Sequence, residues 1–457
     1  MTYQEKKEIA LNQFRKIREK GSVSLKPKFT SHFFRKRKKT NKLDLTNFNN
    51  VISVDIENKI AEVEGLTVFY DLSKECLKYG LLPRVVPELR NITVGGAISG
   101  LGVEASSFKF GLVHESILEC EVLTGNGEVV ICSKTKNEDL FYSLPNSLGT
   151  IGYILKCKIK LVEAKKYVQL NLVRFDSFEK YFTNLKNICK DKEIDFIDGI
   201  IFSENDCVII TGNFIDNLPI DKKLNNFKIN IFWKFLKNRN NNEAFLTIWD
   251  FLWRWDIDLF WCLHDSPLEF TENKIFRIIF GKFFLKSNII SKLNHYYQDF
   301  IESKFANLFK LNPEKNNSQN EKILQDVCLN IDKCKNFMDW HDKNLSTYPI
   351  WICPILENPK EKNYPLYQID GNLTIDIGIY KGNKRPKNTP ENYFNREIEK
   401  KILENKGLKG LYSVSYYSEK EFWSQYKKDI YDSVKNKYDK NNIFPNLYSK
   451  VVGKITL

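Results

Sequence analysis

A glycine-rich stretch at residues 93–104 constrains the fold of this chain more than any other part of its sequence. It holds four glycines within eight residues: Gly95, Gly96, Gly100 and Gly102. Glycine tolerates positive φ and lacks the Cβ that would keep a ligand away from the backbone. Successive amides in such a loop form a concavity that binds anions such as a pyrophosphate. The spacing is not that of a Walker loop, because no Gly-Lys-Ser/Thr follows, nor that of a Rossmann turn at the first strand of a βαβ unit.

The segments on either side of this stretch show strand, turn and helix patterns. Residues 51–55 and 60–63 predict a hairpin, and the pattern of residues 68–79 predicts a helix that ends at a glycine. Downstream, the Gly-Asn-Gly at residues 125–127 is a strong hairpin signal between two extended segments. Residues 153–161 alternate apolar side chains with several lysines, as expected of a strand with one wet face.

Several sequence words, spread from the glycine-rich stretch toward the C-terminus, match one known family. They are Val86-Pro87-Glu88-Leu89, Thr93-Val94-Gly95-Gly96, Lys109-Phe110-Gly111-Leu112, Ala164-Lys165-Lys166-Tyr167-Val168, Tyr348-Pro349-Ile350-Trp351, Ile375-Asp376-Ile377-Gly378 and Glu421-Phe422-Trp423. With them the chain resembles the vanillyl-alcohol oxidase/PCMH flavoprotein family and, within it, the delta(24)-sterol reductases. The resemblance runs from about residue 20 to the C-terminus and implies an α+β fold. A PCMH-type FAD-binding domain of two subdomains would precede an α/β cap, or substrate, domain with an antiparallel sheet.

This resemblance divides the chain into four expected parts. Residues 1–19 would form an N-terminal amphipathic helix, and residues 20–165 the FAD-binding domain. Residues 166–430 would form the cap, and residues 431–457 a C-terminal segment that packs back on the FAD-binding domain. The pattern of residues 422–438 predicts one continuous helix across the last boundary.

The resemblance implies FAD as the cofactor and NADPH as its electron donor, although no second nucleotide fingerprint is visible. We expect the Gly95 and Gly96 amides to lie within hydrogen-bonding reach of FAD. The full set of expected FAD contacts is Arg35, Pro87, Thr93, Val94, Gly95, Gly96, Ala97, Ile98, Gly100, Leu101, Gly102, Val103, Glu104, Ala105, Ser106, Ser107, Gly111, Gly149, Thr150 and Gly152. The early loop has no Gly-Gly-His, so we expect non-covalent FAD; covalent attachment would point to His32 or His114.

Reduction of an isolated carbon–carbon double bond needs a proton donor as well as a hydride. The candidates are cap residues that the resemblance turns toward the flavin, or histidines that titrate near neutral pH: Tyr412, Tyr416, Tyr417, His264 and Tyr380. Each of these residue types is more often structural than catalytic. After Leu259-Phe260-Trp261 the family pattern implies an acidic residue, but Cys262 stands there.

Residues 227–285 hold five of the chain's eight tryptophans together with interleaved lysines and arginines. Phe245, Trp249, Trp253 and Phe260 would share one helical face. The pattern fits a core helix pair with a wet face, and equally a greasy sterol pocket or a membrane-docking surface. A hydrophobic small molecule such as a sterol is therefore the expected substrate.

The net charge of +13 requires an anionic partner or a well-solvated surface. No nucleic-acid-binding motif accompanies it, so weak binding to anionic membranes is the expected alternative. The basic run at residues 35–39 suits a solvated loop, a membrane-facing patch or part of a pyrophosphate site. The sequence does not predict an oligomeric state.

Ten cysteines without a Cys-x-x-Cys pair indicate no metal site and a reducing compartment. No signal peptide or membrane-spanning run is visible. We therefore expect a cytoplasmic protein, or one peripheral to the endoplasmic reticulum membrane.

Three functional hypotheses follow. The first is an FAD-dependent reductase of a sterol side-chain double bond. The second is an FAD-dependent oxidase or dehydrogenase of an alcohol or sugar. The third is a catalytically silent relative that binds membranes or partners through its basic, aromatic surface.

Overall fold

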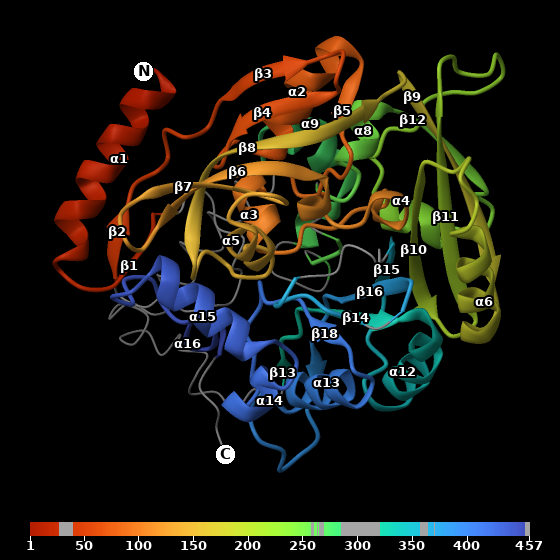
Figure 1. The fold of residues 1–457 in the computed structure, drawn as a ribbon. Helices are drawn as coiled ribbons and strands as arrows, with labels where there is room; N and C mark the ends of the chain where they lie inside the picture. The colour runs from red at the N-terminus through yellow and green to blue at the C-terminus, as the bar shows by residue number, and fades with distance from the viewer. Residues whose placement is uncertain are drawn as a thin grey trace.

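The computed structural model describes residues 1–26, 40–256, 260–262, 264, 269–284, 320–356, 364–369 and 371–452. Arg35, His32 and the basic run at residues 35–39 lie outside these residues, so their expected roles are not placed. Figure 1 shows two large parts. The expected FAD-binding part is coloured red to yellow, and most of the rest of the chain is coloured green to blue.

The N-terminal helix α1 (Tyr3–Arg18) begins at a capping box in which the Thr2 side chain accepts from the Glu5 amide. Its inner face packs through Ala10 and Phe14 against β1 (Val23–Leu25) and β2 (Asn41–Leu43). A buried ion pair of 2.7 Å between Lys6 and Glu64 fixes the helix to the neighbouring sheet. The expected amphipathic helix at the N-terminus is therefore present.

The first large sheet is antiparallel, in the order β3-β4-β8-β6-β7, with β5 paired to the far end of β8. Its strands have the following bounds: β3 Val51–Asp55, β4 Ile60–Glu64, β5 Leu81–Pro83, β6 Ile117–Thr124, β7 Val129–Ser133 and β8 Gly152–Glu163. The helices on this part of the chain are α2 Phe69–Cys76, α3 Val94–Ser99, α4 Ser107–Phe110 and α5 Glu138–Ser143, with short 3₁₀ turns at Leu77–Tyr79 and Val113–Ser116. The two predicted hairpins and the helix ending at Gly80 are confirmed.

The second sheet has eight antiparallel strands in the order β12-β9-β11-β10-β15-β16-β14-β18. Its strands have the following bounds: β9 Tyr167–Phe175, β10 Phe196–Ser203, β11 Asp206–Ile215, β12 Glu243–Thr247, β14 Gln325–Asn330, β15 Ile350–Leu356, β16 Leu373–Ile379 and β18 Leu408–Lys409. A separate two-stranded ribbon pairs β13 (Asn320–Glu321) with β17 (Asn383–Lys384). Together with the first sheet and the helices, this arrangement confirms the expected α+β fold.

Three helices cover the outer face of the eight-stranded sheet, at the right and bottom of Figure 1. They are α6 (Phe178–Ile188), α12 (Ile331–Asn344) and α13 (Tyr393–Glu404). Alternate residues of the central strands, such as Ile352 and Ile377, point into this helix-covered core. The residues between them, such as Trp351 and Cys353, point the other way and join the core of the FAD-binding part. We call these the outer and inner faces of the cap sheet.

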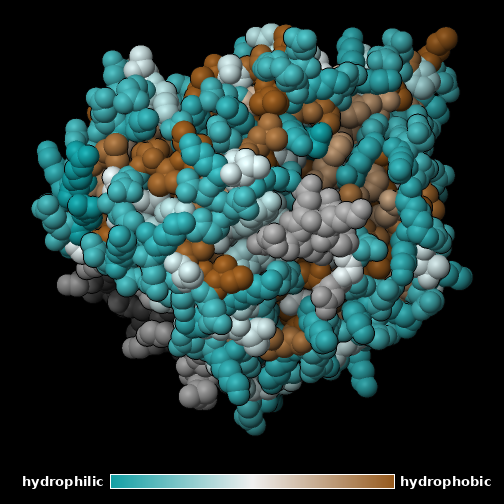
Figure 2. Space-filling view, in the orientation of Figure 1, coloured by the Kyte–Doolittle hydropathy of each residue, from teal (hydrophilic) through white to brown (hydrophobic). Residues whose placement is uncertain are grey.

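The remaining helices lie between the sheets or close to the C-terminus. They are α7 Phe232–Lys237, α8 Ile248–Leu252, the 3₁₀ turn Glu269–Glu272, α9 Lys274–Phe284, α14 Glu419–Trp423, α15 Lys428–Tyr438 and α16 Leu447–Val451. The surface in Figure 2 is mostly hydrophilic on the face shown, with hydrophobic side chains in scattered groups. Within the described residues, no helix combines the length and the apolar composition that crossing a bilayer requires.

Two helix predictions are wrong. The expected helix over residues 422–438 is broken between α14 and α15, where the Lys427 amide donates to the Pro365 carbonyl instead of continuing the helix. The expected aromatic helical face at residues 245–260 is also absent, because Phe245 lies in β12 and α8 ends at Leu252. In both cases contacts with distant segments outweigh the local periodicity.

Candidate functional site

The glycine-rich stretch begins the short helix α3, with Thr93 as its N-cap. The Gly96 amide donates to Thr93 Oγ1 at 3.1 Å, and the Gly95 amide donates to the Gly65 carbonyl at 2.8 Å. A Cβ on Gly95 would lie 2.9 Å from that carbonyl oxygen, so glycine is needed for the close approach of α3 to this chain segment. Both amides thus have partners within the protein, and their contact with FAD remains a prediction.

The loop at residues 146–150 lies beside α3 and adopts an unusual backbone. The Leu148 amide donates to the Ser99 carbonyl at 2.9 Å. Asn146, Leu148 and Gly149 have positive φ values of 60°, 50° and 73°. Such angles are uncommon outside glycine and often mark ligand-binding sites. The structure therefore brings together the two segments in which FAD contacts were expected, 93–104 and 149–152.

Buried polar groups around this pair of segments lack partners among the described residues. They are the hydroxyl groups of Ser143 and Ser147 and both ring nitrogens of His114. Burial lowers the pKa of His114 to about 3, so the ring is neutral at physiological pH. A buried polar group without a hydrogen bond costs about 1–3 kcal/mol, and such groups are normally paired. These unpaired groups fit a polar cofactor such as FAD beside α3, and His114 packs edge-on against Tyr364 at 4.5 Å.

Several residues expected to contact FAD are instead buried in the protein core. Val94, Ala97, Ile98, Ala105 and Ser107 are each at most 2% exposed. Their side chains pack within the protein, so an FAD contact from them would have to come through the backbone. Leu101, Gly102 and Val103 are among the partly exposed residues of the stretch, and Leu101 has φ of 60°.

Other expected contacts are already engaged within the chain. The Ser106 hydroxyl donates to the Arg84 carbonyl at 2.8 Å. The Thr150 hydroxyl donates to the Ser147 carbonyl at 2.7 Å and also contacts the Tyr431 hydroxyl of α15 at 3.1 Å. A Cβ on Gly111 or Gly152 would collide with a neighbouring side chain, so both positions require glycine for packing. Their FAD contacts, like that of the buried Pro87, remain predictions.

Glu104, expected near the flavin, is tied to the cap by a buried ion network. Arg254 follows α8 and is fully buried; its guanidinium lies 2.9 Å from Glu104 and 2.7 Å from Asp198 of β10. Burial acts to lower the pKa of Arg254, but the two carboxylates outweigh it and raise the pKa above its usual value. The indole of Trp255 also donates to Asp198, at 3.0 Å. Arg254, one of the basic residues interleaved in the segment 227–285, is therefore buried and does not lie on a solvent-exposed face.

A neighbouring carboxyl, Glu88, completes this network. Burial, followed by the charge of Glu104, raises the pKa of Glu88 well above its usual range. Burial next to Glu104 thus favours the neutral form of the Glu88 carboxyl. The network links the loop after the glycine-rich stretch to the inner face of the cap sheet.

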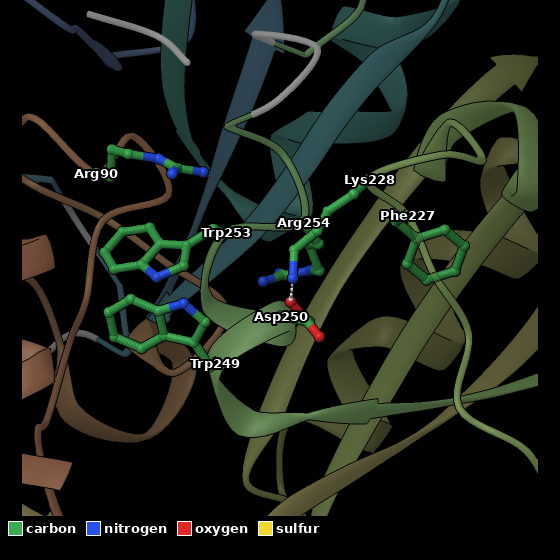
Figure 3. Close-up of a pocket in the computed structure, with 7 residues that line it drawn as sticks. All are labelled: Arg90, Phe227, Lys228, Trp249, Asp250, Trp253 and Arg254. Carbon is green, nitrogen blue, oxygen red and sulfur yellow. Dashed lines mark ion pairs between the residues drawn. The ribbon is translucent and has the colours of Figure 1, made fainter. Parts of the chain in front are cut away.

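A small cavity next to this network lies at the junction of the two parts of the chain. Figure 3 shows Trp249 and Trp253 close together, with Arg90 beside Trp253 and Lys228 paired to Asp250. The cavity measures about 50 Å³. That volume holds a few water molecules and is far too small for a flavin or a sterol. We therefore assign this aromatic cluster to the junction between the parts and not to a ligand site.

Three of the five proton-donor candidates contact other groups than the remaining two do. His264 contacts Glu272 at 3.2 Å and packs on Trp233. Tyr417 is fully buried, and its hydroxyl donates to the Glu399 carbonyl at 3.5 Å. The amide of Tyr416 donates to the same residue's carboxylate at 2.8 Å. The structure thus does not bring these three candidates together with the other two.

The other two candidates, Tyr380 and Tyr412, converge on one carboxyl that sequence reasoning missed. The Tyr380 hydroxyl donates to Asp326 Oδ1 at 2.6 Å. Burial raises the pKa of Asp326 to about 6, although hydrogen bonding from Tyr380 and Tyr412 acts to lower it. All three residues are partly exposed to solvent. A carboxyl with such a pKa, next to two phenols, is a candidate acid at neutral pH.

Aromatic side chains stand beside Tyr380 on the same inner face. The Phe260 ring lies 5.2 Å from both the Tyr380 and the Trp351 rings, and Trp261 lies 6.0 Å from Tyr380. Cys262, at the position where an acid was expected, has its sulfur 3.9 Å from the Tyr380 carbonyl oxygen. The site therefore combines an apolar wall with a group that can give a proton.

Sequence comparisons identify a cofactor-binding segment in the first part of the chain. Residues 30–133 match the model of an FAD binding domain. The chain is therefore an FAD-binding flavoprotein. Over most of its length the chain is similar to delta(24)-sterol reductases. The human reductase is 28% identical over 91% of this chain and 78% of its own length, and the Arabidopsis thaliana reductase is 26% identical over 91% and 77%. Cytokinin dehydrogenase 1 of A. thaliana is 33% identical, but over only 31% of this chain and 24% of its own length.

Proposed function

We propose that this protein reduces a carbon–carbon double bond in the side chain of a sterol, with FAD as cofactor and NADPH as electron donor. One observation carries the proposal: the similarity to delta(24)-sterol reductases covers 91% of the chain and so includes the cap as well as the FAD-binding part. NADPH follows from the family resemblance. The proposed FAD contacts are those expected from the sequence, with the corrections described above.

When bound and reduced, FAD supplies the hydride. The chain must then hold an apolar substrate, exclude water and supply a proton. The aromatic residues around Tyr380 provide an apolar wall on the inner face. Tyr412 is the proposed proton donor. Tyr380 donates a hydrogen bond to Asp326, the carboxyl with which Tyr412 also interacts. A positioned acid contributes typically about 10²–10⁴-fold to the rate of such a step.

Two other functions have less support. Oxidation of an alcohol or sugar would call for a base that removes a proton, whereas the inner face presents phenols and a carboxyl of raised pKa. The relative with a dehydrogenase name matches only 31% of this chain. A catalytically silent protein would need no such acid group beside an aromatic wall.

The decisive experiment combines a spectrum with a product analysis. Purified protein should show the flavin spectrum, and acid precipitation should release the flavin into the supernatant. Anaerobic NADPH should bleach the flavin, and a sterol with a side-chain alkene should then restore its colour. Mass spectrometry of the sterol should show a gain of two hydrogens. A reduced flavin that reacts with oxygen but not with any sterol alkene would disprove the reductase function and favour the oxidase.

We also propose weak, peripheral binding to anionic membranes, from which a sterol would be taken. Helix α9 exposes Ile275, Ile278 and Ile279 at one face, with exposed fractions of 68%, 57% and 56%. Exposed apolar side chains on a helix that also carries lysine suit an interfacial contact. Flotation with anionic vesicles should show binding that weakens with salt, and Ile278→Asp should reduce it. Equal flotation of the variant would exclude α9 as the contact.

A further inference from the structure

We propose that Asp326 is a positioning residue that stores the reaction proton and passes it to the phenol that protonates the substrate. The inference rests on the proposed reductase function and adds a second carboxyl, Asp376, as the partner of Asp326. Neither residue was expected from the sequence as part of the site.

Two glycines make room for the contact between phenol and carboxyl. Asp326 of β14 pairs in register with Gly378 of β16, and Tyr380 lies two residues beyond that glycine on the same face. A Cβ on Gly378 would lie 2.5 Å from the Tyr380 hydroxyl oxygen. The Tyr380 phenol therefore occupies the space that a side chain at position 378 would fill. A Cβ on Gly410 would lie 3.1 Å from Asp326 Cβ and 3.2 Å from a Tyr412 ring carbon. The backbone is thus shaped to bring both phenols to Asp326.

A second carboxyl, that of Asp376 on β16, lies on the same inner face as Asp326. Asp376 pairs in register with Cys328 and is 2% exposed. The Cys328 thiol lies 3.7 Å from its Oδ1. Burial, followed by the charge of Asp326, raises the pKa of Asp376 well above its usual range. Burial and mutual repulsion of the two carboxyls thus both favour a bound proton on the pair.

The ionisable groups facing the two carboxyls come from several segments. They are Tyr380 and Asp376 of the β16 segment, Cys328 of β14, Tyr412 after β18, and Cys262 of the segment that carries Phe260. Each of these is neutral or anionic, so the environment favours a bound proton on the carboxyl pair.

The proton balance of the step is simple. The Tyr412 O–H bond breaks as a C–H bond forms on one alkene carbon, while the hydride adds to the other. The phenolate oxygen then takes the proton from Asp326, and the carboxyl pair regains one from water. The sum is alkene, NADPH and one proton giving alkane and NADP⁺.

The test compares Asp326→Asn with Asp342→Asn in the full-length holoenzyme. Asp342 is a matched control, because it accepts an equally short 2.6 Å hydrogen bond from Tyr348, beside the outer-face core. Two rates are measured between pH 5.5 and 8.5: flavin reduction by NADPH, and anaerobic reoxidation by a sterol with a side-chain alkene.

In the wild type and in Asp342→Asn, reoxidation should slow as pH rises through about 6, because the stored proton is lost from Asp326. Asp326→Asn should reoxidise about 10²-fold more slowly and without that pH dependence. Its reduction by NADPH should be unchanged. Asp326→Asn with a wild-type pH profile would overturn this inference alone, whereas a wild type that never reduces a sterol alkene would overturn the proposed function and the inference with it.

A second variant keeps the proposal testable if Asp326→Asn does not fold. Tyr380→Phe removes a hydrogen bond that lowers the pKa of Asp326 and keeps the ring in place. The pH at which reoxidation slows should therefore move upward. An unchanged pH would show that Asp326 does not supply the proton.

Discussion

The two faces of the cap sheet are built from the same strands but differ in composition and in expected role. Along β15 and β16, residues such as Ile352 and Ile377 point to the outer face, where helices α6, α12 and α13 cover them. Their immediate neighbours Cys353 and Asp376 point to the inner face, against the FAD-binding part. The outer face is mainly an apolar core, whereas the inner face carries carboxyls, phenols and indoles. Because successive side chains of a strand point to opposite faces, neighbouring residues of one sheet can belong to a stabilising core and to a reactive surface.

A matched pair of contacts sharpens this comparison. Tyr348 donates to Asp342 at 2.6 Å beside the outer core, and Tyr380 donates to Asp326 at 2.6 Å on the inner face. The hydrogen bonds are alike, so the difference between the pairs lies in their surroundings. The inner pair has a second phenol, Tyr412, and a second carboxyl, Asp376, next to it. Chemistry is therefore expected from the inner pair alone.

The largest effect should come from the inner phenol. Tyr412→Phe removes the proposed proton donor and should slow alkene reduction by about 10²–10⁴-fold, while reduction by NADPH is preserved. Single-turnover reoxidation under anaerobic conditions measures this step directly. Tyr348→Phe, the matched change beside the outer core, should leave the rate within a few-fold of wild type. Similar rates for the two variants would mean that Tyr412 does not donate the proton.

The next largest effect should come from the ion network that joins the inner face to the loop after the glycine-rich stretch. Arg254→Met would leave the Glu104 and Asp198 carboxylates buried without their cation, at a cost of about 3–5 kcal/mol. Because the contact between Arg254 and Glu104 ties the loop to the cap, the amount of bound flavin should also decrease. Denaturant unfolding and flavin content measure the two effects.

Lys409→Met is the control for that change. It breaks another fully buried ion pair, 2.9 Å from Lys409 to Glu399, within the cap. It should cost similar stability with little loss of flavin at temperatures where the protein stays folded. Equal flavin loss in both variants would show that Arg254 acts through global stability only.

A third change tests the outer face as a purely structural core. Ile377 is fully buried there, so Ile377→Ala should lower the free energy of unfolding by about 2–5 kcal/mol. The rate of alkene reduction in the folded fraction, and its pH dependence, should stay as in wild type. Denaturant titration and single-turnover kinetics check both statements. A changed pH profile would show that the two faces are coupled more tightly than the structure indicates.

Local patterns predicted much of the fold but little of the site. The hairpins at β3–β4 and β6–β7 follow from alternation and turn residues, and the structure contains both. The helix expected at residues 422–438 failed because a distant carbonyl at Pro365 binds the chain at its break. Periodicity reports local preference and carries no information on such contacts.

Asp326 and Asp376 were not predicted as site residues from the sequence, for a related physical reason. An alternating strand with polar residues on one face is ordinarily half exposed to water. Here a second part of the chain covers that face, so the same pattern marks a buried site. Tyr380 was expected from the family resemblance, but its partner Asp326 lies 54 residues earlier and meets it only through strand pairing.

The smallest effect, and the most specific to the inner face, is a pH dependence of stability. The pKa of Asp376 is raised above its usual value of 3.8, so between that value and the raised pKa the folded chain holds a proton that the unfolded chain has released. The free energy of unfolding then falls by about 1.4 kcal/mol per pH unit from this group as pH rises through that window. Asp376→Asn cannot titrate and should therefore become more stable relative to wild type with each unit of pH. Urea unfolding of both proteins from pH 5 to pH 8 measures the difference, and a difference that stays constant would show that Asp376 is ionised in the folded protein.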